Sequence, residues 1–182
     1  SLGRVITQTS ARNSKLTYFY TGLQTVEVDP LSKITTYVFN ARGQTVKETD
    51  KLGRITTTSF DGHNRPTKVV MPEGNSVGYV YDKKHNPTKI TLKPKTGSAA
   101  AALVRSFTYD AKWNRPLTAT DPLGRVTSYT YDATTGNLLS VKQPLVGGQT
   151  PTTTMTYNAR GQVLTSTDPL GKVTRYTYDT TK

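Results

Sequence analysis

Hydrophobic and polar positions alternate along short segments of the chain, and residues typical of turns separate these segments. Residues 33–39 and 125–131 are two examples, both rich in Thr, Val, Ile and Tyr. A period of two over such lengths predicts β-strands. In residues 33–39 the even positions Ile34, Thr36 and Val38 share one face, and the odd positions share the other. Because both faces are of mixed polarity, the pattern predicts a single-layered sheet without a deep core.

A motif of aromatic, any residue, aromatic and Asp recurs with a period of about 21 residues. Its most complete copies end in the pairs Tyr81 with Asp82, Tyr109 with Asp110, Tyr131 with Asp132 and Tyr178 with Asp179. A fixed period of this length is typical of tandem repeats. The Asp can bond the backbone two residues further on, and a Gly or Asn four or five residues past the aromatic can adopt a left-handed conformation. We therefore predict a first turn in each repeat, with the left-handed position at Gly43, Asn64, Asn86, Asn114, Gly136 and Gly161.

A second motif, Asp-x-Leu-Gly, lies between the copies of the first. It runs from Asp50 to Gly53, from Asp121 to Gly124 and from Asp168 to Gly171. Asp at the first position, Pro at the second position of two copies and Gly at the fourth predict a type I turn. The distance from this Asp to the next motif aromatic is constant at ten residues, which indicates one strand of fixed length.

We interpret residues 1–182 as one continuous array of about seven to eight β-hairpin repeats, of which residues 1–17 are a degenerate first copy. Two insertions, near residues 93–104 and 144–154, interrupt the period at corresponding places. Such insertions map to loops at one face or edge of a repeat array. A single helical turn over Ala99 to Ala102 stays open. An isolated hairpin is only marginally stable, so each repeat needs its neighbours.

Composition agrees with an extended, thin and ordered structure. Hydrophobic residues make up 34% of the chain, charged residues 20% and aromatics 9%, with a mean hydropathy of -0.55. The absence of cysteine excludes disulfides and thiolate metal sites. No apolar run is long enough to span a membrane. A net charge of +12 attracts anionic partners, but the basic residues are dispersed, so we expect no specific nucleic-acid role.

The aspartates, which could serve in catalysis, already have a structural role in the two turn motifs. All nine aspartates stand at one of the two turn motifs, and no glycine-framed nucleophile or phosphate loop is present. His63 and His85 occupy nearly the same place in adjacent first turns, where we expect them to be exposed, and a structural metal site needs more ligands than two histidines supply. We therefore expect no enzyme activity, no cofactor and no metal.

Aromatic side chains leave two alternatives open. Trp113 stands in a first turn, where it could stack on a sugar or pack on the neighbouring repeat, and we favour the packing. All eleven tyrosines lie in the strand before a first turn. Stacking on single-stranded nucleic acid would use such tyrosines, but their strict period favours a structural ladder.

The two motifs together resemble the YD repeats of the rearrangement-hotspot (Rhs) family, which include bacterial polymorphic toxins, toxin-complex C components and teneurins. The resemblance covers the chain from about Tyr18 to Asp179. It implies a strip of hairpins wound in a spiral, as a segment of a hollow shell. In bacterial members the shell encloses a C-terminal toxin polypeptide of the same protein, and an aspartyl autoprotease with an Asp-Pro-x-Gly core releases it. Asp121 to Gly124 and Asp168 to Gly171 are similar to that core, but they recur as ordinary turns, so we do not transfer the protease function.

The resemblance also implies a secreted or cell-surface location and the toxin polypeptide as the partner inside the shell. The alternative function is an extracellular adhesion or carbohydrate-binding repeat, with glycans as further candidate partners.

Overall fold

The computed structural model describes residues 4–12 and 14–179, which form sixteen β-strands and no helix. The strands are β1 (Thr7–Thr9), β2 (Lys15–Thr21), β3 (Gln24–Val28), β4 (Ile34–Phe39), β5 (Thr45–Thr49), β6 (Ile55–Phe60), β7 (Pro66–Val70), β8 (Ser76–Tyr81), β9 (Pro87–Lys93), β10 (Leu103–Tyr109), β11 (Pro116–Thr120), β12 (Val126–Tyr131), β13 (Leu138–Lys142), β14 (Thr152–Tyr157), β15 (Val163–Thr167) and β16 (Val173–Arg175). The predicted all-β class is confirmed.

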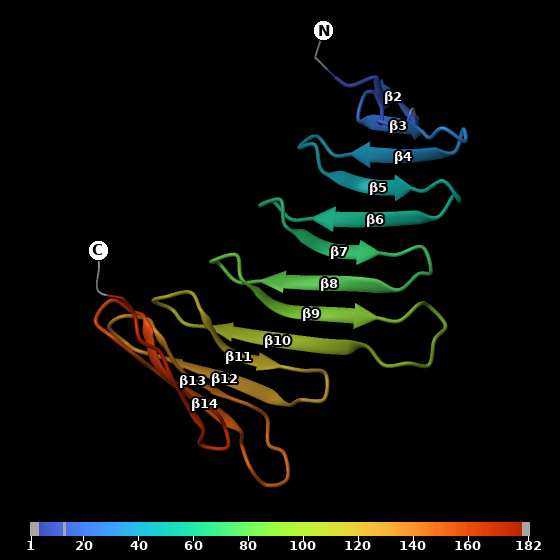
Figure 1. The fold of residues 1–182 in the computed structure, drawn as a ribbon. Coiled ribbons are helices and arrows are strands. Elements are labelled where there is room, and N and C mark those ends of the chain that lie inside the picture. The colour runs from blue at the N-terminus through green and yellow to red at the C-terminus, as the bar shows by residue number, and fades with distance from the viewer. Residues whose placement is uncertain (1–3, 13, 180–182) are drawn as a thin grey trace. The chain divides into compact units, whose positions relative to one another are not determined.

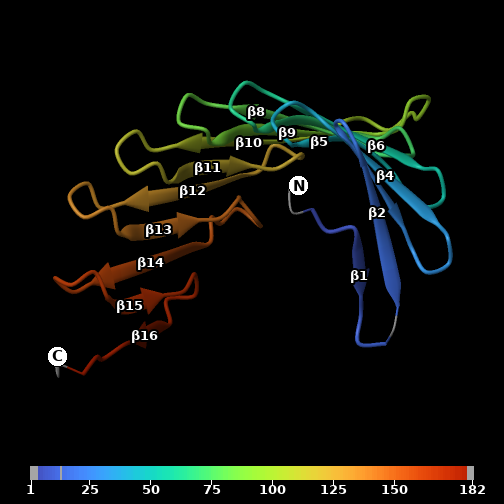
Figure 2. The ribbon, with the colours of Figure 1, turned by 90° about the horizontal axis from the view of Figure 1, so that it is seen from above.

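The described residues divide into two compact units, one of residues up to 79 together with 91–102, the other of residues 80–90 together with 103–179. Within each unit the strands are antiparallel and follow one another in chain order, so every hairpin pairs with the next. Figure 1 shows these strands with a turn at each end. In the second unit, β10 to β16 form a single layer (Figure 2). That the chain is one uninterrupted array stays a prediction.

The strands that precede a first turn, such as β4 and β12, place their motif aromatics on one face of the sheet, here called the aromatic face. Tyr37 of β4 lies opposite Glu48 of β5, and Tyr129 of β12 lies opposite Val141 of β13. The other face, here called the hydroxyl face, carries mainly Thr, Ser and Lys. Three cross-strand hydroxyl pairs at 2.7 Å lie on it, joining Thr108 to Thr118, Thr130 to Ser140 and Thr156 to Thr165.

The described part of the chain contains no buried hydrophobic side chain, and Ser76 at 8% exposure is its one buried polar residue. This confirms the predicted sheet without a deep core. Because the aromatics are half-buried rather than enclosed, the apolar contribution to stability comes from contacts between neighbouring strands. The sheet therefore depends on pairing with the next repeat to a greater degree than a two-layered domain does.

The second-turn motif closes its hairpins in the way the sequence predicts. In the turn 50–54 the Gly53 amide donates to the Asp50 carbonyl at 2.8 Å, and the Asp50 amide donates to the Arg54 carbonyl at 2.9 Å. Gly53 has a φ of 75°, which a glycine adopts without steric cost. This is a type I turn followed by a left-handed residue, a common three-residue hairpin loop.

A β-bulge follows the second motif aromatic in most first-turn hairpins. Register shifts occur beside Phe39, Phe60, Tyr109, Tyr131 and Tyr157. In each case the strand after the turn carries one extra residue, as between Tyr131 paired with Leu138 and Thr130 paired with Ser140. Bulges increase local twist and re-aim side chains. Their recurrence indicates that they belong to the repeat.

Both insertions replace a second turn. Residues 94–102 connect β9 to β10, and residues 143–151 connect β13 to β14. The alanines at 99–102 form no helical turn. Each insertion thus stands where its unit would otherwise have a second turn, and that the two insertions lie at one edge stays a prediction. Among the residues described, no helix is long and apolar enough to cross a membrane.

Candidate functional site

The aspartate at the start of each motif turn holds the loop with its carboxylate. In the second turns the Asp50, Asp121 and Asp168 Oδ1 atoms each accept two backbone amides, from the residues two and four positions later, at 2.8 to 3.0 Å. The residues that close these turns, Gly53, Gly124 and Gly171, all have φ between 75° and 79°. The predicted second-turn anchors therefore act as one repeated structural device.

The same arrangement closes the first turns. Asp61 and Asp82 accept amides from the second and fourth following residues at 2.8 to 3.0 Å. Asp132 binds the amides of Thr134 and Thr135, and Asp110 binds the Trp113 amide, because these two turns are one residue longer. Asn40 and Asn158 replace Asp in two repeats and make the same pair of bonds. Asp179 is the last residue described, and the loop that would follow it lies outside the described residues.

Arginine or asparagine four positions later engages the second oxygen of several of these carboxylates. Arg65 Nη2 lies 2.7 Å from Asp61 Oδ2, and Arg54 and Arg125 form the same pair with Asp50 and Asp121. The Arg65 hydrogen bond lowers the pKa of Asp61 to about 2. The pKa values of Asp50 and Asp121 are lowered by their arginines, and that of Asp82 by the Asn86 amide. All four are thus ionised hydrogen-bond acceptors at neutral pH.

One predicted left-handed position is wrong. In the turn 82–86 His85 has a φ of 70°, whereas we predicted Asn86 there. The fourth residue after the aromatic takes this conformation, as it does at Gly43 and Asn64, so position in the loop outweighs residue preference. Asn86 instead donates its side-chain amide to Asp82 at 2.9 Å. The predicted exposure of His63 and His85 is confirmed.

The tyrosine hydroxyls link successive repeats in the second unit. In four repeats the hydroxyl of the second motif aromatic donates to a backbone carbonyl near the start of the strand that follows the preceding first turn. The pairs are Tyr109 with Pro87 at 2.9 Å, Tyr131 with Pro116 at 2.9 Å, Tyr157 with Leu138 at 2.7 Å and Tyr178 with Val163 at 2.8 Å. These bonds give the tyrosines a structural role between repeats, and the absence of nucleic-acid stacking stays a prediction. Tyr81 ends β8 and is half-buried, whereas Tyr176 and Tyr178 lie beyond the end of β16 rather than within it.

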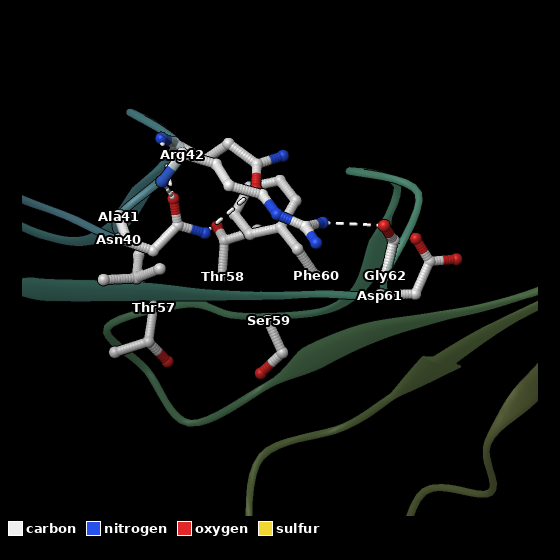
Figure 3. Close-up of a pocket in the computed structure, with 11 residues that line it drawn as sticks. Asn40, Ala41, Arg42, Thr57, Thr58, Ser59, Phe60, Asp61 and Gly62 are labelled. Atoms are coloured by element: carbon white, nitrogen blue, oxygen red, sulfur yellow. Dashed lines mark hydrogen bonds between the residues drawn. The ribbon is translucent and has the colours of Figure 1, made fainter.

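In the first unit, side chains bridge one first turn to the next. Arg42 donates to the Gly62 carbonyl at 2.7 Å and to Asn64 Oδ1 at 3.0 Å, and Gln44 donates to the Asn64 carbonyl at 2.9 Å. Figure 3 shows Arg42 reaching across Phe60 to Gly62, above a shallow hollow of about 700 Å³. In the same view Thr57 and Ser59 point away to the opposite face.

The second unit repeats these bridges with other residues. Lys84 donates to the Ala111 carbonyl, and Lys112 donates to the Ala133 carbonyl at 2.7 Å. Asn86 and Asn114 exchange a reciprocal pair of amide hydrogen bonds at 2.6 and 3.0 Å. Sequence reasoning missed these bridges. A basic residue three positions after the motif aromatic, at Arg42, Lys84, Lys112 and Arg160, was the available signal.

Trp113 packs on the neighbouring repeat. A Cβ atom added at Gly136 would meet Trp113 Cδ2 at 2.8 Å and Cε2 at 3.0 Å, so the indole lies against the Gly136 backbone. Lys112 Nζ lies 4.7 Å from the centre of the indole ring. The packing interpretation of Trp113 is therefore confirmed by its contacts. Gly136 is itself buried beneath the ring.

Anchored turns, side-chain bridges between neighbouring turns and single-layered strands define an antiparallel β-hairpin repeat protein. The RHS repeat family model matches residues 39–76, 109–145 and 157–181, more than half of the chain. The chain therefore belongs to the RHS repeat family.

Solved structures of larger proteins are similar to this chain over nearly its whole length. The crystal structure of TcdB2-TccC3-TEV matches with a TM-score of 0.54 and 15% sequence identity, over 98% of this chain and 13% of that chain. The crystal structure of TcdB2-TccC3 without its hypervariable C-terminal region has a TM-score of 0.41 and 16% identity, over 98% and 13% of the two chains. No curated protein sequence matches the chain. The first likeness shows the fold, and the chain spans only about an eighth of that structure's length.

Proposed function

We propose that the chain is a non-catalytic scaffold, a segment of the wall of a β-shell that encloses the C-terminal toxin polypeptide of the same full-length protein. The observation that carries this proposal is a sheet with two chemically different faces and no core of its own. Both faces of such a sheet are free to meet different surroundings. A wall that separates an interior from an exterior has this property.

Membership of the RHS repeat family and the fold likeness to TcdB2-TccC3-TEV support the proposal. Similar hairpins make up part of that larger protein, of which this chain matches 13%. A wall built of repeats can be lengthened by adding hairpins, because each one contacts mainly its neighbours. This suits a structure that must surround an unfolded or partly folded polypeptide.

The turn chemistry supports a structural rather than a catalytic role. Each described aspartate before Asp179 accepts at least one backbone hydrogen bond in its own turn. Their carboxylates are committed to holding loops. Secretion or display at the cell surface is part of the same proposal and rests on the family alone.

The alternative, a carbohydrate-binding adhesion repeat, draws its main support from exposed aromatics. Trp113, the residue best suited to stack on a sugar, already packs on Gly136. The structure thus offers the shell more support than the adhesion module, and binding of glycans stays a prediction.

Limited proteolysis of the full-length gene product tests the shell. We expect the polypeptide that follows the repeats to resist proteinase K in the intact protein and to be cleaved rapidly when it is expressed alone. Mass spectrometry of the fragments measures both rates. Equal cleavage rates in the two contexts, or a gene product that ends with its repeats, would overturn the proposal.

A further inference from the structure

Gly78 interrupts the hydroxyl face of the first unit. In all the remaining repeats, the residue three positions before the second motif aromatic carries a side chain. In most of them this residue is Thr or Ser. These positions are Thr17, Thr36, Thr57, Ser106, Ser128, Thr154 and Arg175. Within the strands the structure describes, Gly78 is the one glycine. A glycine inside a strand weakens it and often marks a place where a ligand approaches the backbone closely.

Ser76, two residues earlier on the same face, is a second departure from the repeat. The equivalent positions in other repeats are mostly apolar and β-branched, as at Ile34, Ile55, Val126 and Val173. Ser76 is only 8% exposed, although it lies in a sheet without a core. Ser76 and Gly78 are thus neighbours on one face. Gly78 leaves space where other repeats have a side chain, and Ser76 puts a hydroxyl group where most of them have an apolar one.

These substitutions open a hollow of about 160 Å³, here called the Gly78 hollow. It is lined by Thr67, Lys68, Ser76, Gly78, Thr91 and Lys93. Lys68 lies directly opposite Gly78 in the strand register. A Cβ atom at Gly78 would lie 3.9 Å from the Thr67 carbonyl and 4.0 Å from the Thr91 carbonyl, so the missing side chain leaves the space open without strain.

The charge at the Gly78 hollow is positive. Neither lysine belongs to an ion pair among the residues described. The strand glutamates Glu27 and Glu48 lie on the aromatic face, opposite Tyr18 and Tyr37. Glu73 is exposed in the turn before β8 and does not line the hollow, and every aspartate stands in a turn or at the C-terminal end of the described chain. Two ammonium groups with hydroxyl donors beside them favour a compact anion, since lysine binds phosphate and sulfate groups as a point charge.

We propose that the Gly78 hollow binds a tetrahedral oxyanion, a sulfate or phosphate group. Lys68 and Lys93 supply the charge, and the Ser76 and Thr91 hydroxyls donate hydrogen bonds. The missing side chain at Gly78 admits the anion to the sheet surface. This inference is independent of the shell proposal, because it depends on two departures from the repeat rather than on the repeat itself.

The test is a titration of the isotope-labelled 182-residue chain with sodium sulfate and with sodium phosphate at constant ionic strength, followed by NMR. We expect saturable shifts at the amides of Ser76, Gly78 and Thr91. Gly78→Thr restores the side chain of the other repeats and fills the hollow, so it should weaken binding about tenfold or more while leaving the fold intact. Lys68→Met should also weaken binding about tenfold.

Lys142→Met is the matched control, since Lys142 stands on the hydroxyl face of the second unit opposite Ser128 and does not line the Gly78 hollow. It should leave the affinity unchanged. Sulfated and phosphorylated monosaccharides then distinguish the two sources of the anion, and saturable binding of either at the same amides supports the site. Shifts that do not saturate, or that survive Gly78→Thr in a folded protein, would overturn the proposal. Equal losses from Lys142→Met and Lys68→Met would do the same, since they would reflect only the net charge.

Discussion

The edge formed by the first turns and the edge formed by the second turns differ in how they connect neighbouring repeats. At the first turns, side chains cross from one loop to the next, as from Arg42 to Gly62 and from Lys112 to Ala133. At the second turns, the hydrogen bonds of Asp50, Asp121 and Asp168 stay inside their own loops. Among the residues described, the ion pair of Lys51 with Asp29 at 3.5 Å is the one polar link between second-turn loops. The leucines of these loops are 72% to 82% exposed at positions 31, 52, 123 and 170.

This difference explains where the repeat tolerates change. Both insertions lie at second turns, whose loops make fewer bonds to the next repeat than the first turns do, so a longer loop disturbs less there. The first turns keep nearly constant length, because each serves as a bonding partner for its neighbours. We infer that the first-turn edge couples the repeats, whereas the second-turn edge only closes hairpins.

The largest expected effect comes from Gly136→Ala compared with Gly124→Ala. Both glycines have positive φ, 73° and 76°, so both substitutions incur the left-handed cost of about 1–2 kcal/mol. Only at Gly136 does the new Cβ collide with Trp113, which adds about 1–3 kcal/mol. Urea unfolding of the two variants measures the difference. Equal losses of stability would show that packing between first turns contributes nothing.

Loop insertion sharpens the comparison. Four residues of Gly and Ser placed between Gly147 and Gly148 should cost less than about 1 kcal/mol, the entropy of a longer loop. The same insertion after Ala133 should cost about 2–3 kcal/mol, because it separates Asp132 from its amide donors and displaces the acceptor of Lys112. Thermal unfolding of the two variants provides the measurement. Equal losses of stability from the two insertions would contradict the inference that the first-turn edge couples the repeats.

Removing one tyrosine hydroxyl has a smaller expected effect. Tyr131→Phe deletes the hydrogen bond to the Pro116 carbonyl and should destabilise the protein by about 1 kcal/mol. Tyr129→Phe is the control in the same strand, and it should change the unfolding free energy by less than about 0.5 kcal/mol. Chemical denaturation distinguishes the two. If both variants retain wild-type stability, the tyrosine ladder acts only through its rings.

The smallest expected effect is the pH dependence carried by Asp61 and Arg65. The folded pKa of Asp61, about 2, lies below the unfolded value of about 3.9. Its stabilisation is therefore complete above about pH 4 and is lost as the pH falls towards 2. In Asp61→Asn, the unfolding midpoint should therefore change less with pH between about pH 4 and pH 2 than it does in the wild-type protein. Asn40 already occupies the equivalent position in a neighbouring turn.

The equivalent second-turn variant, Asp50→Asn, should reduce the pH dependence of the unfolding midpoint by a smaller amount than Asp61→Asn does. Arg54 is 57% exposed and Arg65 only 21%, so solvent screens the second-turn pair more strongly. A larger change for Asp50→Asn than for Asp61→Asn would reverse the proposed order of the two edges.

Sequence reasoning predicted what depends on local spacing. The ten-residue distance from the second-turn Asp to the motif aromatic fixes the length of strands such as β4 and β12, and both formed as predicted. The left-handed position in the turn 82–86 was wrong, because residue preference pointed to Asn86 while the loop geometry selects the fourth position, His85. Counting from the aromatic alone could not have settled it, because Asn114 and Gly136 take this conformation at the fifth position of turns that are one residue longer.

Contacts between repeats could not be predicted in this way. Because Trp113 is a large aromatic residue in a turn, the sequence predicts that it packs on a neighbouring repeat. Its partner, Gly136, depends on how adjacent hairpins are staggered and could not be predicted. The amide pair of Asn86 and Asn114 joins residues 28 positions apart and has no local pattern. The Gly78 hollow became visible only when register placed Lys68 opposite the missing side chain.

Amide hydrogen exchange at two turn glycines tests the coupling most directly. The Gly136 amide donates to the Asp132 carbonyl at 2.8 Å and the Gly124 amide to the Asp121 carbonyl at 2.9 Å, so each turn supplies a similar bond of its own. If the first-turn edge joins the repeats, Gly136, covered by Trp113, exchanges more slowly than Gly124 in the 182-residue chain. Equal exchange rates, or slower exchange at Gly124, would contradict this account.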